Sequence, residues 1–186
     1  MDLSISETTK DELLSVVDVP SGIIASLKNN ILSIKGKLGT IEKDVTKLPV
    51  NIKISENQIE IKPYGSRKKD RAISNTCRTL VKNMVRGVQD GYTYKLKIVY
   101  AHFPISVKVK GKEVHVDNFF GERSSRVSHI VGELTKVNVT GEDVIVQGPS
   151  LEDVSQTAAN IESSTKIKQK DQRVFLDGLY IYQTHM

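Results

Sequence analysis

The chain contains one arrangement of strand-forming residues twice, and this repeat limits the possible folds more than any other feature. Residues 54–61 (ISENQIEI) and 139–146 (VTGEDVIV) each indicate a strand, a tight polar turn and a second strand. β-branched residues stand at matching places, with Ile54, Ile59 and Ile61 corresponding to Val139, Val144 and Val146. A period of about 85 residues is too long for a solenoid, so duplication of a small domain explains it better.

The similarity between the halves continues on both sides of these hairpins. Residues 31–39 (ILSIKGKLG) resemble residues 114–121 (VHVDNFFG). Each segment has the alternating pattern of a strand and then enters a loop that contains glycine. A helix is expected after each hairpin. We therefore predict the α+β class, with two tandem copies of a small domain, each a mainly antiparallel sheet packed with one main α-helix. The expected parts are an N-terminal extension (1–17), an N-terminal domain (18–95) and a C-terminal domain with a basic C-terminal segment (96–186).

The longest helix is predicted over residues 70–89, where apolar residues recur at spacings of three and four. Its apolar face is formed by Ile73, Cys77, Leu80, Val81, Met84 and Val88, and its opposite face by Arg71, Arg78, Lys82 and Arg86. Such a basic row can contact successive phosphates, or it is only the solvated face of an amphipathic helix. The second helix is expected to follow Ser150, with Asp153 placed as in a capping box.

Positive charge is gathered in two segments. The net charge of +5 alone says little about a polyanionic partner. Residues 62–86 hold Lys62, Arg67, Lys68, Lys69, Arg71, Arg78, Lys82 and Arg86 against the single acid Asp70. The second cluster is Lys166, Lys168, Lys170 and Arg173, against Asp171. Each cluster is either a solubilising surface or a contact for a polyanion.

Two further patterns lie around the second half. Residues 92–100 predict a strand that connects the halves, and Pro104 then interrupts it. Residues 173–182 (RVFLDGLYIY) carry Asp177-Gly178 between apolar residues, which predicts a hairpin with a type I′ turn. Tyr180 and Tyr182 in this segment either stack on bases or pack with their hydroxyls exposed to water.

The sequence shows no constellation that would support catalysis, so we predict that the protein is not an enzyme. Its four histidines are scattered without cysteine partners at metal-ligand spacing, and no phosphate-binding glycine loop occurs. We expect no metal, cofactor or small-molecule substrate. The single cysteine, Cys77, is predicted to be a core residue. Neither a signal peptide nor a transmembrane segment is found, and we expect a soluble intracellular protein without a membrane partner.

Three motifs, in order, resemble signatures of one ribosomal family. They are residues 91–105 (GYTYKLKIVYAHFPI), 148–156 (GPSLEDVSQ) and 170–180 (KDQRVFLDGLY). The chain is similar to the large-subunit ribosomal protein family numbered six in bacteria and nine in eukaryotes, over residues ~18–183. The tail, with Asp177-Gly178-Leu179-Tyr180, resembles the eukaryotic and archaeal branch, and His102-Phe103-Pro104 favours a eukaryote. The first ~17 residues resemble nothing familiar.

The resemblance implies two copies of one α+β fold and attachment to large-subunit rRNA near the sarcin–ricin loop and the stalk base. It also implies neighbouring large-subunit and stalk-base proteins as partners. The cytoplasm, on the ribosome, is the implied location, with transient nuclear or nucleolar passage if the source is eukaryotic. Because the C-terminal domain of relatives carries much of the rRNA contact, the implied ligands are first Lys166, Lys168, Lys170 and Arg173, and next Arg123 and Arg126. The charge pattern adds Arg67, Lys68, Lys69, Arg71, Arg78 and Lys82.

Two alternative functions remain open from the sequence. One is a protein-interaction scaffold whose basic faces meet acidic partners, and the other is an RNA-binding protein that is not ribosomal. Both would use the same charged surfaces, so residue patterns alone do not separate them.

Overall fold

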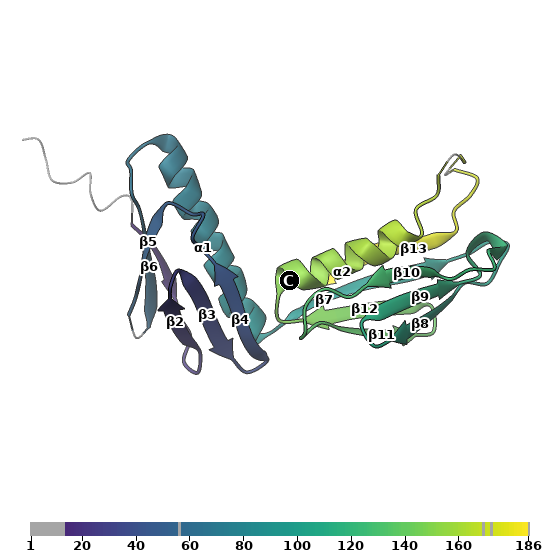
Figure 1. Ribbon diagram of the computed structural model, residues 1–186, viewed down its shortest axis with the longest axis horizontal. Helices are drawn as coiled ribbons and strands as arrows, with labels where there is room; N and C mark the ends of the chain where they lie inside the picture. Colours follow the sequence, from purple (N-terminus) through teal and green to yellow (C-terminus); the bar gives the residue numbers. More distant parts are fainter. Residues whose placement is uncertain (1–13, 56, 169, 172, 186) are drawn as a thin grey trace, which may run out of the picture. The chain divides into compact units, whose positions relative to one another are not determined.

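The chain divides into two units, Met1–Gln89 and Asp90–Met186, in a computed structural model that describes residues 14–55, 57–168, 170–171 and 173–185 (Figure 1). The division lies earlier than the predicted boundary between residues 95 and 96. That boundary would cut β7 (Tyr92–Val99) in two. β7 pairs along its whole length with strands of the second unit, so the unit begins before it.

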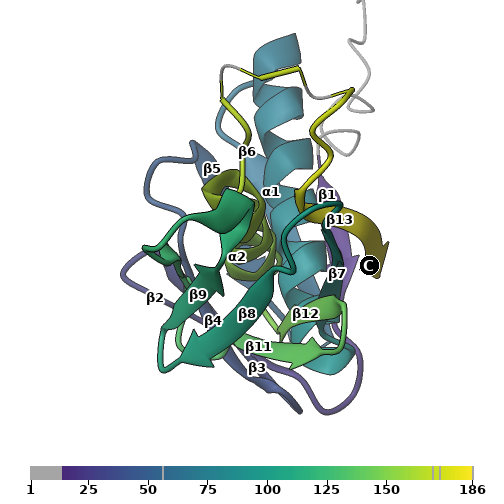
Figure 2. The ribbon, with the colours of Figure 1, turned by 90° about the vertical axis from the view of Figure 1, so that its right-hand side faces the viewer.

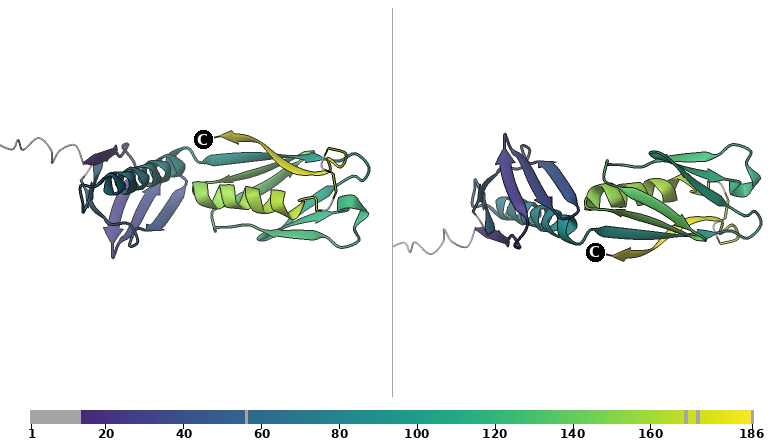
Figure 3. Two further views of the ribbon diagram at one scale, coloured as in Figure 1. Left: turned by 90° about the horizontal axis from the view of Figure 1, so that it is seen from above. Right: turned by 90° about the horizontal axis from the view of Figure 1, so that it is seen from below.

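The first unit combines two small sheets with one helix. Its strands are β1 (Ser15–Asp18), β2 (Ile24–Lys28), β3 (Ile31–Gly36), β4 (Gly39–Asp44), β5 (Val50–Ile54) and β6 (Gln58–Pro63). They form antiparallel sheets in the orders β1-β6-β5 and β2-β3-β4. The helix α1 (Lys68–Gln89) packs along β1, β3 and β6 (Figure 3).

The start of this unit corrects one predicted boundary. β1 lies mostly within the expected N-terminal extension of residues 1–17. Val17 pairs with Ile59 of β6 and is buried, because its apolar side chain completes the core between sheet and helix. Residues 1–13 of the expected extension lie outside the described residues.

The second unit follows the same plan with one additional strand. After β7 come β8 (Ser106–Lys110), β9 (Glu113–Asp117), the 3₁₀ turn η3 (Phe119–Gly121), β10 (Arg126–His129), β11 (Lys136–Thr140), β12 (Asp143–Gly148), α2 (Leu151–Ser164) and β13 (Gly178–His185). The sheets have the orders β11-β12-β7-β13 and β10-β9-β8, and their pairs are antiparallel. α2 packs on β7, β10, β12 and β13.

The strand orders confirm the duplication that the sequence pattern predicts. β6 lies between β1 and β5 in the first unit, and β12 lies between β7 and β11 in the second. β3 and β9 are each the middle strand of the other sheet. The registers also agree, because Ile54 pairs with Ile59 and Val139 pairs with Val144. Both predicted hairpins therefore have the same strand pairing.

The last strand shows that the predicted C-terminal hairpin is wrong. The chain does not reverse at Asp177-Gly178. Instead, β13 starts at Gly178 and pairs with β7, which covers the edge of that strand (Figure 2). Asp177 is buried, and its Oδ1 accepts a hydrogen bond from the Ala101 backbone N–H at 2.7 Å. This long-range contact replaces the local turn.

Both helices begin close to where the sequence indicates, and α1 also ends at the predicted residue. α1 buries Cys77, Val81, Met84 and Val88 of its predicted apolar face, while Leu80 is half-buried. Gly91 follows the helix with a φ of 77°, a conformation that suits glycine at a helix end. At the start of α2, Ser150 Oγ accepts a hydrogen bond from the Asp153 N–H at 3.3 Å, which confirms the predicted cap.

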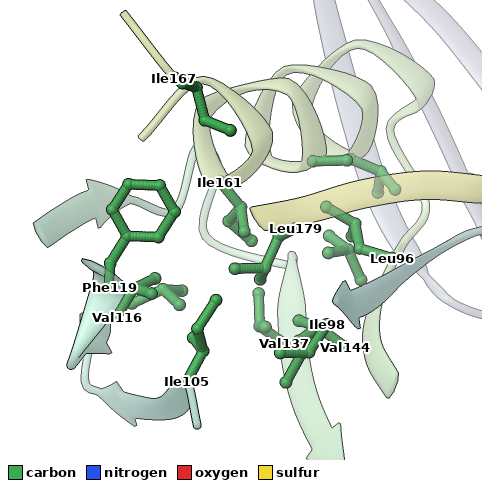
Figure 4. Close-up of a cluster of buried hydrophobic side chains, with 14 of the residues drawn as sticks. Leu96, Ile98, Ile105, Val116, Phe119, Val137, Val144, Ile161, Ile167 and Leu179 are labelled. Carbon is green, nitrogen blue, oxygen red and sulfur yellow. The ribbon is translucent and has the colours of Figure 1, made fainter. Parts of the chain in front are cut away.

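Each unit has its own apolar core. The core of the first unit joins Leu32, Ile34, Ile59 and Ile61 to α1. The core of the second unit joins α2 to both sheets through Leu96, Ile98, Val116, Phe119, Val144, Ile161 and Leu179 (Figure 4). Cys77 is fully buried in the first core, and its burial raises the pKa of the thiol. It is therefore a core residue, as predicted, and not an activated nucleophile.

Candidate nucleic-acid interface

The basic segment after α2 holds its lysines outward because the residues between them are buried. Thr165 and Ile167 are buried, whereas Lys166 and Lys168 are exposed. Thr165 Oγ1 donates to the Glu162 carbonyl at 3.1 Å and accepts from the Leu179 N–H at 3.0 Å. These bonds attach the segment to α2 and to β13. The two lysines are thus presented to solvent by a fixed backbone.

Lys170 is positioned by two aromatic rings. Its Nζ lies 4.7 Å from the centroid of the Phe175 ring and 5.2 Å from that of the Phe120 ring. Cation–π contacts of this kind contribute roughly 0.5–1 kcal/mol at exposed sites. The ammonium group stays exposed, so it is available to an anion while its position is already restricted.

Arg126 has a different environment from the lysines. Its Nε and Nη2 donate to the two carboxylate oxygens of Glu122, at 2.9 and 2.6 Å, and its Nη1 donates to the Ser164 carbonyl at 2.9 Å. The guanidinium carbon lies 4.2 Å from the centroid of the Phe119 ring. The hydrogen bond to Glu122 raises the pKa of Arg126 and lowers the pKa of Glu122, so the pair stays ionised.

These groups surround one hollow of about 600 Å³ at the end of α2. It is lined by Phe119, Phe120, Glu122, Arg126, Val127, Ser164, Lys166, Ile167, Lys168 and Lys170. We call it the basic hollow. Four of the predicted ligand residues therefore meet at one place, although Arg126 and the lysines are far apart in the sequence.

Two other predicted ligands of the second unit lie outside the lining of the hollow. Arg123 is exposed in the loop that follows η3. Arg173 is also exposed, and its Nη2 lies 3.2 Å from Asp171 Oδ2. Hydrogen bonds from the Arg173 backbone and side chain lower the pKa of Asp171. A surface pair such as this is weak, so it does not prevent Arg173 from turning to a phosphate.

The remaining predicted ligands lie on the first unit. Arg71, Arg78 and Lys82 are exposed on α1, as the helical spacing predicts. Arg67, Lys68 and Lys69 are exposed at the start of the helix, where the Arg67 N–H donates to Asp70 Oδ2 at 3.1 Å. The structure thus brings together one group of cations around the basic hollow and another along α1. Which of them touch RNA remains a prediction.

Sequence reasoning missed Phe120, Phe175 and Glu122. Phe120 and Phe175 hold Lys170, and Glu122 holds Arg126. The carboxylate could have been found, because Glu122 and Arg126 are four residues apart in a short basic loop. The aromatic contacts join separate segments of the chain and leave no local pattern.

In the ranges that the structure describes, no group of three His, Cys, Asp or Glu side chains could hold a metal ion. No helix in the described part of the chain has the length and apolar character of a membrane span.

Comparison with known families now adds to this geometry. The family model described as ribosomal protein L6 matches residues 19–91 and again residues 103–178. The chain belongs to the ribosomal protein L6 family. The two matched segments correspond to the two units, apart from two residues at the end of the first segment, which agrees with the duplicated fold.

Named relatives of this L6 chain match it over almost their entire lengths. A protein of Methanosarcina mazei named large ribosomal subunit protein uL6 is 42% identical over 172 residues, covering 92% of this chain and 97% of the relative. Proteins of the same name from Staphylothermus marinus and Saccharolobus solfataricus are 43% and 42% identical, covering 89% and 90% of this chain and 91% and 92% of the relatives. These relatives are archaeal, which agrees with the predicted eukaryotic and archaeal branch.

Proposed function

We propose that this protein is a structural component of the large ribosomal subunit that binds and organises rRNA and catalyses no reaction. Membership of the L6 family supports the ribosomal role. The single observation that carries the binding mode is the basic hollow, where Lys166, Lys168 and Lys170 line one recess beside Arg126. Concentrated cations on a fixed backbone are the arrangement that binding to phosphates requires.

The mechanism is electrostatic and architectural. The lysines neutralise phosphates and release the counterions that those phosphates had condensed, which drives association. A second contact comes from Arg71, Arg78 and Lys82 on α1, in the other unit. Because the two units are linked in one chain, binding of one raises the effective concentration of the other at the RNA. Two RNA segments are thereby held in register.

The place of binding is part of the proposal. The three family-like motifs support a position on large-subunit rRNA near the sarcin–ricin loop and the stalk base, with neighbouring large-subunit and stalk-base proteins as partners. The protein would act in the cytoplasm on the ribosome, after nuclear or nucleolar passage if its source is eukaryotic. Contacts by Arg67, Lys68, Lys69, Arg123 and Arg173 belong to the same proposal.

Removal of the three lysines tests the binding mode. Changing Lys166, Lys168 and Lys170 together to Ala should weaken rRNA binding and flatten its salt dependence. Each lost phosphate contact should remove roughly 0.7–0.9 from the slope of log affinity against log salt concentration. The affinity of the full chain for a large-subunit rRNA fragment is measured between low and moderate salt.

A matched control variant distinguishes the loss of phosphate contacts from a general loss of positive charge. Changing Lys28, Lys35 and Lys53 to Ala removes the same charge from exposed positions of the first unit that carry no predicted contact. This variant should keep nearly the whole slope. Equal slopes for the two variants and the unchanged protein would remove the three lysines from the interface. Sedimentation tests the alternative function. If the unchanged protein no longer sediments with large subunits after a high-salt wash, a scaffold for acidic proteins is favoured instead.

A further inference from the structure

The plane of the Arg126 guanidinium is fixed by its neighbours in the protein. Three of its nitrogens donate to Glu122 and to the Ser164 carbonyl, which holds the group at the end of α2. Its guanidinium carbon lies over the Phe119 ring, 4.2 Å from the ring centroid. The side chain is 31% exposed and lines the basic hollow, so its open part faces that recess. Hydrogen bonds and an aromatic contact thus hold the guanidinium group in place.

The charge of Arg126 is already balanced. Glu122 binds it through both carboxylate oxygens, the closer at 2.6 Å, so a phosphate would have to compete with an existing bidentate pair. The exposed part of the group lines the basic hollow. Guanidinium groups stack on planar π systems, which makes stacking the contact that Arg126 can still offer.

The hollow matches a ligand of nucleotide size. Its volume of about 600 Å³ lies within the range of pockets that enclose small organic molecules. Lys166, Lys168 and Lys170 also line it, so anionic groups and a planar group can be bound together. An RNA nucleotide supplies both, with its base and its flanking phosphates.

Phe120 gives independent support. This residue has φ 52° and ψ 27°, a left-handed conformation that costs energy for a bulky side chain. Its ring lines the hollow and lies beneath the Lys170 ammonium group, 5.2 Å away. The strained backbone thus places an aromatic wall and a cation at the recess.

We propose that the basic hollow receives one unpaired RNA nucleotide, whose base stacks on the Arg126 guanidinium while Lys166, Lys168 and Lys170 bind its phosphates. This inference rests on the proposed rRNA binding. A base within a duplex is stacked on both sides and cannot enter a recess, whereas bases in bulges and loops can. In this scheme Arg126 is an rRNA ligand, as the family resemblance implies, and it contacts a base.

The test compares two RNA hairpins that differ in one bulged nucleotide. The bulge carries 2-aminopurine, whose fluorescence falls when it stacks. The full-length protein should bind the bulged hairpin about tenfold more tightly than the paired one, as expected for one stacked base, and should quench the fluorescence. Arg126→Lys keeps the charge but removes the plane, so it should bind both hairpins alike, without quenching and with an unchanged salt slope.

Controls distinguish the inference from the function on which it rests. The variant with Ala at positions 28, 35 and 53, which lie outside every predicted contact, should leave the preference for the bulge intact. Equal binding of both hairpins by the unchanged protein, or no quenching, overturns the inference even if Arg126→Lys fails to fold. If, in that case, the variant with Ala at positions 166, 168 and 170 still has a smaller salt slope than the unchanged protein, the proposed rRNA binding is retained. If the lysines have no effect on either hairpin, the proposed function fails as well.

Discussion

At the residue scale, the partners of a cation decide what it can do for an external ligand. Lys170 and Arg126 line the same hollow, yet the first is exposed over two rings and the second is paired with Glu122 and Ser164. The family resemblance gives both as candidate rRNA ligands. Only the fold shows that Lys170 is exposed while the Arg126 guanidinium is held by Glu122 and Ser164.

The hydrogen bond that Asp177 accepts leads to a prediction about the stability of the fold. Asp177→Ala removes the acceptor of the Ala101 N–H, a bond that joins the start of β13 to the end of β7. The free energy of unfolding should fall by about 1–3 kcal/mol, because a partly buried donor loses its partner. Urea unfolding measures this change. Asp171→Ala, at an exposed position, should lower the stability much less, and equal losses would show that the Asp177 bond contributes nothing.

At the scale of secondary structure elements, local patterns were predictable and distant contacts were not. The hairpins around Ile59 and Val144 and the faces of α1 follow from spacing within short segments, and the structure confirms them. The turn at Asp177-Gly178 was a sound local expectation that failed. β13 gains more by pairing with β7 than the segment would gain as an isolated hairpin, since an isolated hairpin is marginally stable in water.

The candidate site could likewise be predicted only where its residues are close together in the sequence. The basic segment and the basic row on α1 were visible as charge clusters. The hollow was not, because it requires η3, the start of β10 and the end of α2 to meet. Lys166 and Lys168 are exposed while Thr165 and Ile167 are buried, and Thr165 is bonded to α2 and β13.

β13 has no counterpart among the strands described for the first unit, and its contribution to stability can be measured. Leu179 in β13 is almost completely buried in the core of the second unit. Leu179→Ala should lower the free energy of unfolding by about 2–5 kcal/mol, because it leaves a cavity between α2 and the sheet. Thermal and urea unfolding would record this. Thr184→Ala, at an exposed position of the same strand, is the matched control and should have a small effect.

At the scale of the whole molecule, duplication supplies two similar α+β units that carry charge in different ways. The first unit presents cations along α1, and the second presents them in a segment after α2. α2 itself exposes Glu152 near its start and carries no cation. Under the proposed function, the same plan gives two RNA contacts of different shape, by which one chain organises separate RNA segments.

Photo-crosslinking within purified large subunits tests this account most directly. A photoreactive amino acid replaces Lys168 in the basic hollow, Lys82 on α1 or, as a control, Glu152 on α2. The account predicts cross-links to rRNA from positions 168 and 82 and none from position 152. Cross-links from position 168 to proteins alone, or a chain that does not enter large subunits, would contradict it.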